Sequence, residues 1–177
     1  IMLAIDFEAS CLPRHGRSFP IEVGLAGADG ARSWIIRPHP DWAGWGWTAE
    51  AEALHGLSRA RIEQDGLPAH VVLDQLVEAV GGQRVVADSL IDPYWLETLA
   101  AAAGRSAPFA IDHVATLLDE RQVDEAQISA AVRIADQRCP TRHRAGSDAL
   151  WLACVMAQLW PDLAAAPPVR MPLMSCY

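Results

Sequence analysis

The sequence predicts a mixed α/β fold in which helices flank a five-stranded sheet. Three strand-like segments come first, and the turn-rich GADG joins the second to the third, which is typical of an antiparallel meander. Strands and helices then alternate, which favours parallel strands covered by helices. The predicted strands are residues 1–8, 21–26, 32–37 and 84–88, with a fifth near PFAI at 108–111.

Apolar residues at helical spacing predict the helices. One helix leads into LHGLS, a second runs from Pro68 to about residue 80, and a third runs from Pro93 to about residue 103. The remainder is predicted to be helical and to end in a long helix from about Gly146 to Trp160.

The length of 177 residues fits one domain, spanning residues 1–177, with a tail from about residue 161 that we expect to be loosely packed. No apolar run is long enough to span a membrane, and the four scattered cysteines are expected to be reduced thiols. We therefore expect a cytoplasmic protein without a membrane partner. The first residue is Ile1, which leaves open whether N-terminal residues are missing.

The charge pattern limits the classes of partner. The formal net charge is -8, which argues against a broad basic face for long duplex nucleic acid. All 14 basic residues are arginine, which suits local contacts with phosphate groups. A short or single-stranded nucleic acid therefore remains compatible with the sequence.

Two carboxylates stand where the first strand ends. Asp6 and Glu8 are two residues apart in IMLAIDFEAS, so their side chains point to one face of the strand, about 7 Å apart. D-x-E is common by chance, and on its own it favours a solvated strand end.

The late helix carries a further carboxylate at an unusual position. Asp148 shares one helical stripe with Leu152, Val155 and Leu159, so it heads the side that faces the core. A first-turn acid is stabilised by the helix dipole, but this does not explain the apolar stripe. His143 can share a site with Asp148 only if it lies in the preceding loop or first turn, and a surface role for it is the simpler interpretation.

Asp92 completes the candidate set, and Asp88 lies four residues before it. Asp92 before Pro93 fits an ordinary helix N-cap as well as a site residue, and Asp88 at the end of VVAD is equally ambiguous. Together, acids from a central strand and two helix starts form an all-oxygen site suited to Mg²⁺ or Mn²⁺. Two such ions would offset the repulsion between Asp6 and Glu8.

The sequence resembles the DnaQ-like, DEDDh branch of the 3′-5′ exonucleases over about residues 1–160. Its D-x-E motif matches LAIDFEAS, its second motif matches VVADSLIDPYWL, and its third, H-x-A-x-x-D-A, matches HRAGSDA. The resemblance implies an RNase H-like fold and a 3′-5′ exonuclease that acts on single-stranded DNA or RNA with two Mg²⁺ or Mn²⁺ ions. The choice between DNA and RNA stays open.

The resemblance also implies the role of each site residue. Asp6, Glu8, Asp92 and Asp148 would hold the two metal ions, and His143 would be the general base that deprotonates the attacking water. Phe7 and Ala9 would lie beside the terminal nucleotide. His55, in LHGLS, could reach a phosphate or merely cap the turn.

Some features depart from the family pattern. Ala9 stands where Thr is common and Asp88 stands where Asn is frequent, and lysine is absent. We therefore expect short substrates, weak distributive action or a partner that delivers the nucleic acid, and a homodimer stays open. The alternatives are a catalytically weak DnaQ-like binding module and an RNase H-like endonuclease.

The tryptophans of the loop PHPDWAGWGW allow two interpretations. Trp42, Trp45 and Trp47 could form a platform on which bases stack, or at least two of them could pack the loop against the body. Packing is the favoured interpretation, because large aromatic side chains dominate core burial.

Overall fold

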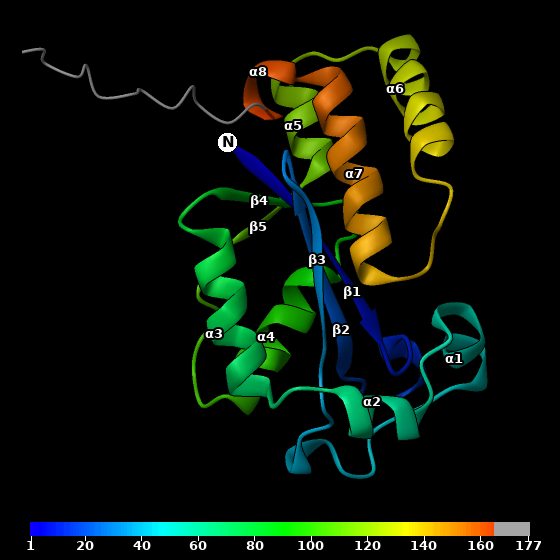
Figure 1. Ribbon diagram of the computed structural model, residues 1–177, viewed down its shortest axis with the longest axis vertical. Coiled ribbons are helices and arrows are strands. Elements are labelled where there is room, and N and C mark those ends of the chain that lie inside the picture. The colour runs from blue at the N-terminus through cyan, green and yellow to red at the C-terminus, as the bar shows by residue number, and fades with distance from the viewer. Residues whose placement is uncertain (165–177) are drawn as a thin grey trace, which may run out of the picture.

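The protein folds around a mixed five-stranded sheet, shown in the computed structural model of Figure 1. The structure describes residues 1–164. The strands are β1 (Met2–Ala9), β2 (Pro20–Gly27), β3 (Gly30–Ile35), β4 (Arg84–Ala87) and β5 (Ile111–His113). The α-helices are α1 (Ala49–His55), α2 (Arg59–Asp65), α3 (Ala69–Val80), α4 (Asp92–Ala102), α5 (Val114–Glu120), α6 (Glu125–Arg138), α7 (Ala145–Leu159) and α8 (Pro161–Ala164), with short 3-10 helices at Pro13–His15 and Pro40–Trp42.

The strand order is β3-β2-β1-β4-β5. β1, β2 and β3 are antiparallel neighbours, whereas β4 is parallel to β1 and β5 is parallel to β4. The predicted meander followed by parallel strands is therefore confirmed, and the arrangement is that of an RNase H-like α/β fold. The fifth strand begins at Ile111, the last residue of PFAI, a little later than predicted.

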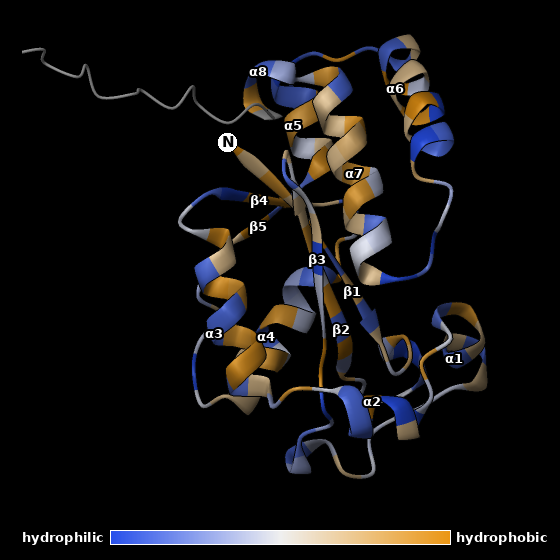
Figure 2. Ribbon diagram, viewed as in Figure 1, coloured by the Kyte–Doolittle hydropathy of each residue, from blue (hydrophilic) through white to orange (hydrophobic). Residues whose placement is uncertain are grey.

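Helices cover both faces of the sheet. The larger core cluster joins alternate residues of β1 and β2 to α3 and α4, and the second joins the other face of β1 to α5 and α7. α6 lies outside α7 and packs on it through Ala131 and Ala135. Figure 2 shows hydrophobic residues concentrated in α3, α4, α7 and the central strands.

Local capping signals explain where several helices begin and end. Thr48 and Ser58 cap α1 and α2, and Asp124 caps α6 in a full capping box with Gln127. α3 ends at Gly81, whose φ of 55° is the left-handed conformation that glycine adopts readily. The predicted helices are present, but α2 was not predicted, because Ile62 is its one buried residue and leaves no helical periodicity.

The loop tryptophans pack against the body, as the favoured interpretation predicts. Trp42 is buried and stacks on Phe19, with ring centroids 5.2 Å apart and an interplanar angle of 12°. Trp45 and Trp47 are half-buried and pack against the same core, and the Trp47 indole N–H donates to Glu52 at 2.8 Å.

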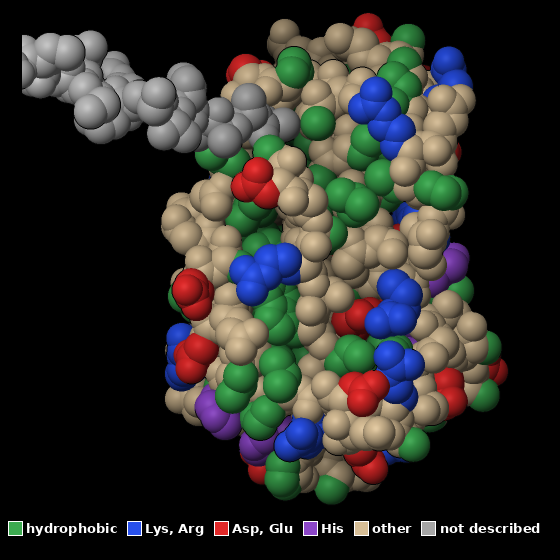
Figure 3. All heavy atoms as spheres, viewed as in Figure 1, with side chains coloured by type: hydrophobic (Ala, Val, Ile, Leu, Met, Phe, Trp, Pro, Cys, Tyr) green, Lys and Arg blue, Asp and Glu red, His purple; other side chains and the backbone are tan. Residues whose placement is uncertain are grey.

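The remaining expectations concern the tail, the thiols and the surface. α8 packs on α7, and the rest of the predicted loose tail lies outside the described residues. Cys11, Cys139 and Cys154 are free thiols. Among the described helices none is long and apolar enough to cross a membrane. On the face in Figure 3, basic and acidic side chains are interspersed rather than gathered by sign.

Candidate active site

The alternation of β1 directs two carboxylates toward α7. Leu3, Ile5 and Phe7 enter the core under α3 and α4, whereas Met2 and Ala4 face α5 and α7. Asp6 and Glu8 continue the second series, because side chains of a strand alternate between its faces. The apolar run therefore ends in carboxylates on the face that α7 covers.

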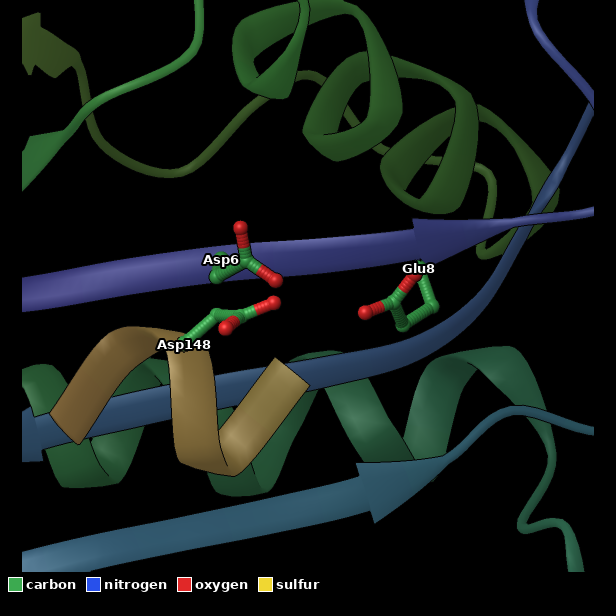
Figure 4. Close-up of side chains that lie close together, drawn as sticks. All are labelled: Asp6, Glu8 and Asp148. Atoms are coloured by element: carbon green, nitrogen blue, oxygen red, sulfur yellow. The ribbon is translucent and has the colours of Figure 1, made fainter. Parts of the chain in front are cut away.

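α7 brings a third carboxylate to the same place. Asp148 lies in its first turn, and of the predicted stripe Leu152 and Val155 are buried, whereas Leu159 is half-buried. Oxygen atoms of Asp6, Glu8 and Asp148 all lie within 4.8 Å of one another. Figure 4 shows the three side chains converging from β1 and α7.

A second group of carboxylates lies where the chain leaves the end of β4. The pairing of β1 with β4 ends at Ala4 and Val86, so the segment that carries Asp6 extends beyond β4. Asp88 follows β4, and Asp92 begins α4 and is 1% exposed. Oxygen atoms of Asp6, Asp88 and Asp92 again lie within 4.8 Å of one another, so the two groups share Asp6.

An ion pair between a buried glutamate and a partly exposed arginine fixes the start of α7 on the sheet. Glu22 of β2 is 1% exposed and accepts hydrogen bonds from Arg144 Nε at 2.8 Å, Arg144 Nη2 at 2.6 Å and the Ala145 backbone N–H at 3.1 Å. Beside it, the absence of a side chain at Gly24 lets the backbone of Ala145 approach β2 closely. This contact sets the position of the helix end that carries Asp148.

His143 lies in the loop directly before α7, where the sequence requires it for a shared site. Its φ of 65° is left-handed, an uncommon conformation for a residue other than glycine. Its backbone N–H donates to Asp148 Oδ2 at 3.0 Å, and Arg142 Nε donates to Asp148 Oδ1 at 2.5 Å. The side chain of His143 is exposed at this boundary.

Burial and mutual repulsion raise the pKa values of the clustered acids. Burial, then the charges of Asp92, Glu8 and other acids, raises the pKa of Asp6 to about 10. The pKa of Glu8 rises to about 7, mainly through burial and the charge of Asp148. Burial and Asp88 raise the pKa of Asp92 to about 8, partly opposed by the Phe7 backbone. Asp88 is more exposed, but partial desolvation of its carboxyl group still raises its pKa, and the charge of Arg142 opposes this.

Three of the five carboxylates, those of Asp6, Glu8 and Asp92, line a cleft of about 630 Å³. Phe7, Ala9 and His55 line it, as does Arg14, which brings a positive charge to the same cleft. His55 is 4% exposed; its Nδ1 accepts from the Leu57 N–H at 3.0 Å, so it caps the turn as one interpretation predicts. Its Nε2 has no hydrogen-bond partner among the described residues, and burial lowers the pKa of the ring.

The residues present fit divalent cations. Five carboxylates supply hard oxygen ligands, and Asp92 Oδ2 is buried without a hydrogen-bond partner in the described part of the chain. Leaving such an atom unsatisfied is costly, and a bound cation would remove that cost. The structure thus places the four predicted ligands, Asp6, Glu8, Asp92 and Asp148, in two overlapping groups.

Sequence reasoning did not identify Glu22, Arg142 and Arg144 as residues of this site. Glu22 carried a signal, because it is the one charged residue in the apolar strand segment IEVGLA. A lone charge in a strand that is buried along its length requires a partner. That partner lies 122 residues away, and no local pattern identifies it.

No protein-family model matches the chain, and no curated protein matches it in sequence. Solved structures do match. A full-length 3′-exonuclease superposes with a TM-score of 0.66 and 16% identity, over 92% of this chain and 61% of that one. A 3′-exonuclease whose structure concerns 3′-end specific recognition of a histone mRNA stem-loop superposes with a TM-score of 0.67 and 16% identity, over 92% of this chain and 64% of that one. E. coli Exonuclease I in complex with a deoxyadenosine oligonucleotide superposes with a TM-score of 0.64 and 11% identity, over 92% of this chain and 42% of that one.

These similarities define the fold. The chain shares its RNase H-like architecture with 3′-exonucleases and Exonuclease I, in agreement with the resemblance found in the sequence. It spans 61% and 64% of the two 3′-exonucleases and 42% of Exonuclease I, and the identities are low. The activity therefore has to be argued from the site itself.

Proposed function

We propose that this protein is a divalent-metal-dependent 3′-5′ exonuclease that hydrolyses single-stranded DNA or RNA to nucleoside 5′-monophosphates. The observation that carries the proposal is the pair of carboxylate groups that share Asp6, because Asp6, Glu8 and Asp92 of these groups line a cleft. The fold shared with 3′-exonucleases supports it, as do the three sequence motifs.

The cation site supplies the electrostatic part of the chemistry. Asp6, Glu8 and Asp148 would hold one Mg²⁺ or Mn²⁺ ion, and Asp6 and Asp92 would contribute to a second. Bound there, the two ions would lower the pKa of a coordinated water and stabilise the charge on the leaving oxygen.

The remaining groups bind the substrate and move the proton. His143 would accept a proton from the water, whose oxygen forms a bond to the terminal phosphorus atom. The bond from phosphorus to the 3′ oxygen of the preceding nucleotide breaks, so the phosphate leaves on the 5′ carbon of the released nucleotide. Phe7 and Ala9 would contact that nucleotide from β1, and His55 would donate from Nε2 to a phosphate oxygen.

The decisive test is hydrolysis of a 5′-labelled single-stranded oligonucleotide, in DNA and RNA versions, with Mg²⁺, Mn²⁺ or EDTA. Wild type should produce a ladder that shortens one nucleotide at a time, and EDTA, Asp6→Ala or His143→Ala should abolish it. Asp29→Asn is the matched control, because Asp29 is exposed in the β2–β3 turn, away from the carboxylate groups.

Two substrates separate the alternatives. Cleavage of a circular single-stranded DNA, which has no 3′ end, would show that the protein is an endonuclease and not an exonuclease. Binding of both linear oligonucleotides without hydrolysis under either metal would favour the binding module.

A further inference from the structure

We propose that Asp88 is a direct ligand of the second divalent cation, so that the protein alone, through Asp6, Asp88 and Asp92, binds this cation before nucleic acid arrives. This inference deepens the proposed function, since it concerns the same carboxylate centre and rests on it. Neither the sequence resemblance nor the superposed folds assign a ligand role to Asp88.

The position of Asp88 follows from the sheet. β4 stops pairing with β1 at Ala4 and Val86, two residues before Asp6, and the chain then leads through Asp88 to α4, which begins at Asp92. Asp88 and Asp92 therefore bracket Asp6 from one connection, and oxygens of the three carboxylates lie within 4.8 Å of one another. This spacing would allow the three carboxylates to hold one metal ion.

A buried, unpartnered atom in this group points to a ligand. Asp92 is 1% exposed, and its Oδ2 has no hydrogen-bond partner among residues 1–164. An exposed carboxylate is hydrated by water and needs no ligand. A buried carboxylate oxygen, by contrast, requires a hydrogen bond or a cation. The neighbours that it faces in the group are carboxylates, which cannot donate when ionised.

The two groups also differ in how the protein compensates their charge. Asp148 of the first group is held by Arg142 Nε and the His143 backbone. Arg142 also lies near Asp88, as does His113, but none of the ion pairs formed within the described residues includes Asp6, Asp88 or Asp92. The second group is therefore the one in which a cation meets three carboxylates with no side chain to displace.

The test measures Mn²⁺ binding directly, without nucleic acid. The full chain is titrated with Mn²⁺ and the free ion is followed by electron paramagnetic resonance, for wild type, Asp88→Asn, Asp88→Ala and the control Asp29→Asn. Wild type and Asp29→Asn should bind two ions. Both Asp88 variants should bind one ion unchanged and the other at least about tenfold more weakly, because affinity follows the number of charged ligands.

Other results would overturn the proposal. Two ions bound with wild-type affinity by both Asp88 variants would show that Asp88 is no ligand, and so would a wild type that binds fewer than two. Thermal unfolding in EDTA confirms that each variant is folded; Asp88 is exposed, so neither substitution should lower the unfolding temperature. If the protein hydrolyses nucleic acid but Mn²⁺ binding does not depend on Asp88, only this inference is refuted. If Mn²⁺ binding depends on Asp88 but no oligonucleotide is hydrolysed, only the proposed exonuclease activity is refuted.

Discussion

The carboxylate of Glu22 and the guanidinium of Arg144 form two parallel hydrogen bonds, at 2.6 and 2.8 Å, between β2 and the residue directly before α7. Glu22 lies opposite Glu8 in the β1–β2 pairing, so the bond joins the strand next to the acidic group to the helix that completes it. The bidentate geometry fixes orientation as well as distance. The pair therefore fixes the segment from which His143 and Asp148 project.

Removing one partner of this pair should cost more than removing both. Arg144→Met leaves the Glu22 carboxylate buried and unpaired and should lower the free energy of unfolding by about 3 kcal/mol. Glu22→Gln should cost less, because the exposed part of Arg144 can be hydrated. The double variant should recover part of the loss of Arg144→Met, and urea unfolding of the four proteins would measure it. A double variant less stable than Arg144→Met would contradict a mutual pairing.

The close approach of β2 and α7 predicts a second, steric sensitivity. A Cβ added at Gly24 would lie 2.2 Å from the carbonyl carbon and oxygen of Ala145, which are backbone atoms that cannot rotate away. Gly24→Ala should therefore lower the free energy of unfolding by about 3 kcal/mol and shift the start of α7. Gly27→Ala is the matched control in the same strand, because its Cβ meets the flexible end of Leu3 at 2.7 Å and should cost about 1 kcal/mol or less. Equal urea midpoints for the two variants would show that α7 is free to move outward.

The sequence predicted what local periodicity encodes. The alternation of β1 placed Asp6 and Glu8 on one face, and the stripe of α7 placed Asp148 toward the core; both are confirmed. The loop tryptophans were ambiguous until the stacking of Trp42 on Phe19 was known.

Local sequence patterns do not predict which distant segments pair with one another. Asp88 stayed ambiguous because its approach to Asp6 depends on the parallel pairing of β1 with β4, which is formed by segments about 80 residues apart. Glu22 was missed for the same reason, since its burial depends on Arg144. A charged residue within an otherwise apolar strand is the signal that would have found it.

The raised pKa values of the acids predict an unusual pH dependence of metal-free stability. In the unfolded chain these groups titrate near 3.8, but in the folded protein the pKa is about 10 for Asp6 and about 8 for Asp92. Between the unfolded and the folded pKa values, the folded state therefore binds more protons than the unfolded state. The contribution of these two groups to stability is fully present below about pH 4 and is lost as the pH rises through the folded pKa values. Between pH 7 and pH 9 these two groups should lower the free energy of unfolding in EDTA by about 4 kcal/mol, with the larger part from Asp6.

The choice of interval and the control make this prediction specific. The lowered pKa of His55 gives the opposite slope at acidic pH, and pH 7 to 9 avoids it. Asp6→Asn should flatten the curve, be more stable than wild type at pH 9 in EDTA and gain less from Mg²⁺. Urea unfolding at the two pH values measures all three, and a wild type that becomes more stable between pH 7 and 9 in EDTA would contradict the predicted clustering of charge.

His143 is predicted to act in catalysis and not in folding, and its backbone allows a precise test. Its φ of 65° favours residues that adopt the left-handed conformation, and asparagine does so more readily than alanine. His143→Asn should therefore keep wild-type stability and bind Mn²⁺ as wild type does, yet lower kcat by about 10²- to 10⁴-fold with little change in KM. His143→Ala should lose the same activity and, in addition, about 1 kcal/mol of stability from backbone strain. Single-turnover hydrolysis and urea unfolding separate these effects, and full activity of His143→Asn would remove His143 from the reaction.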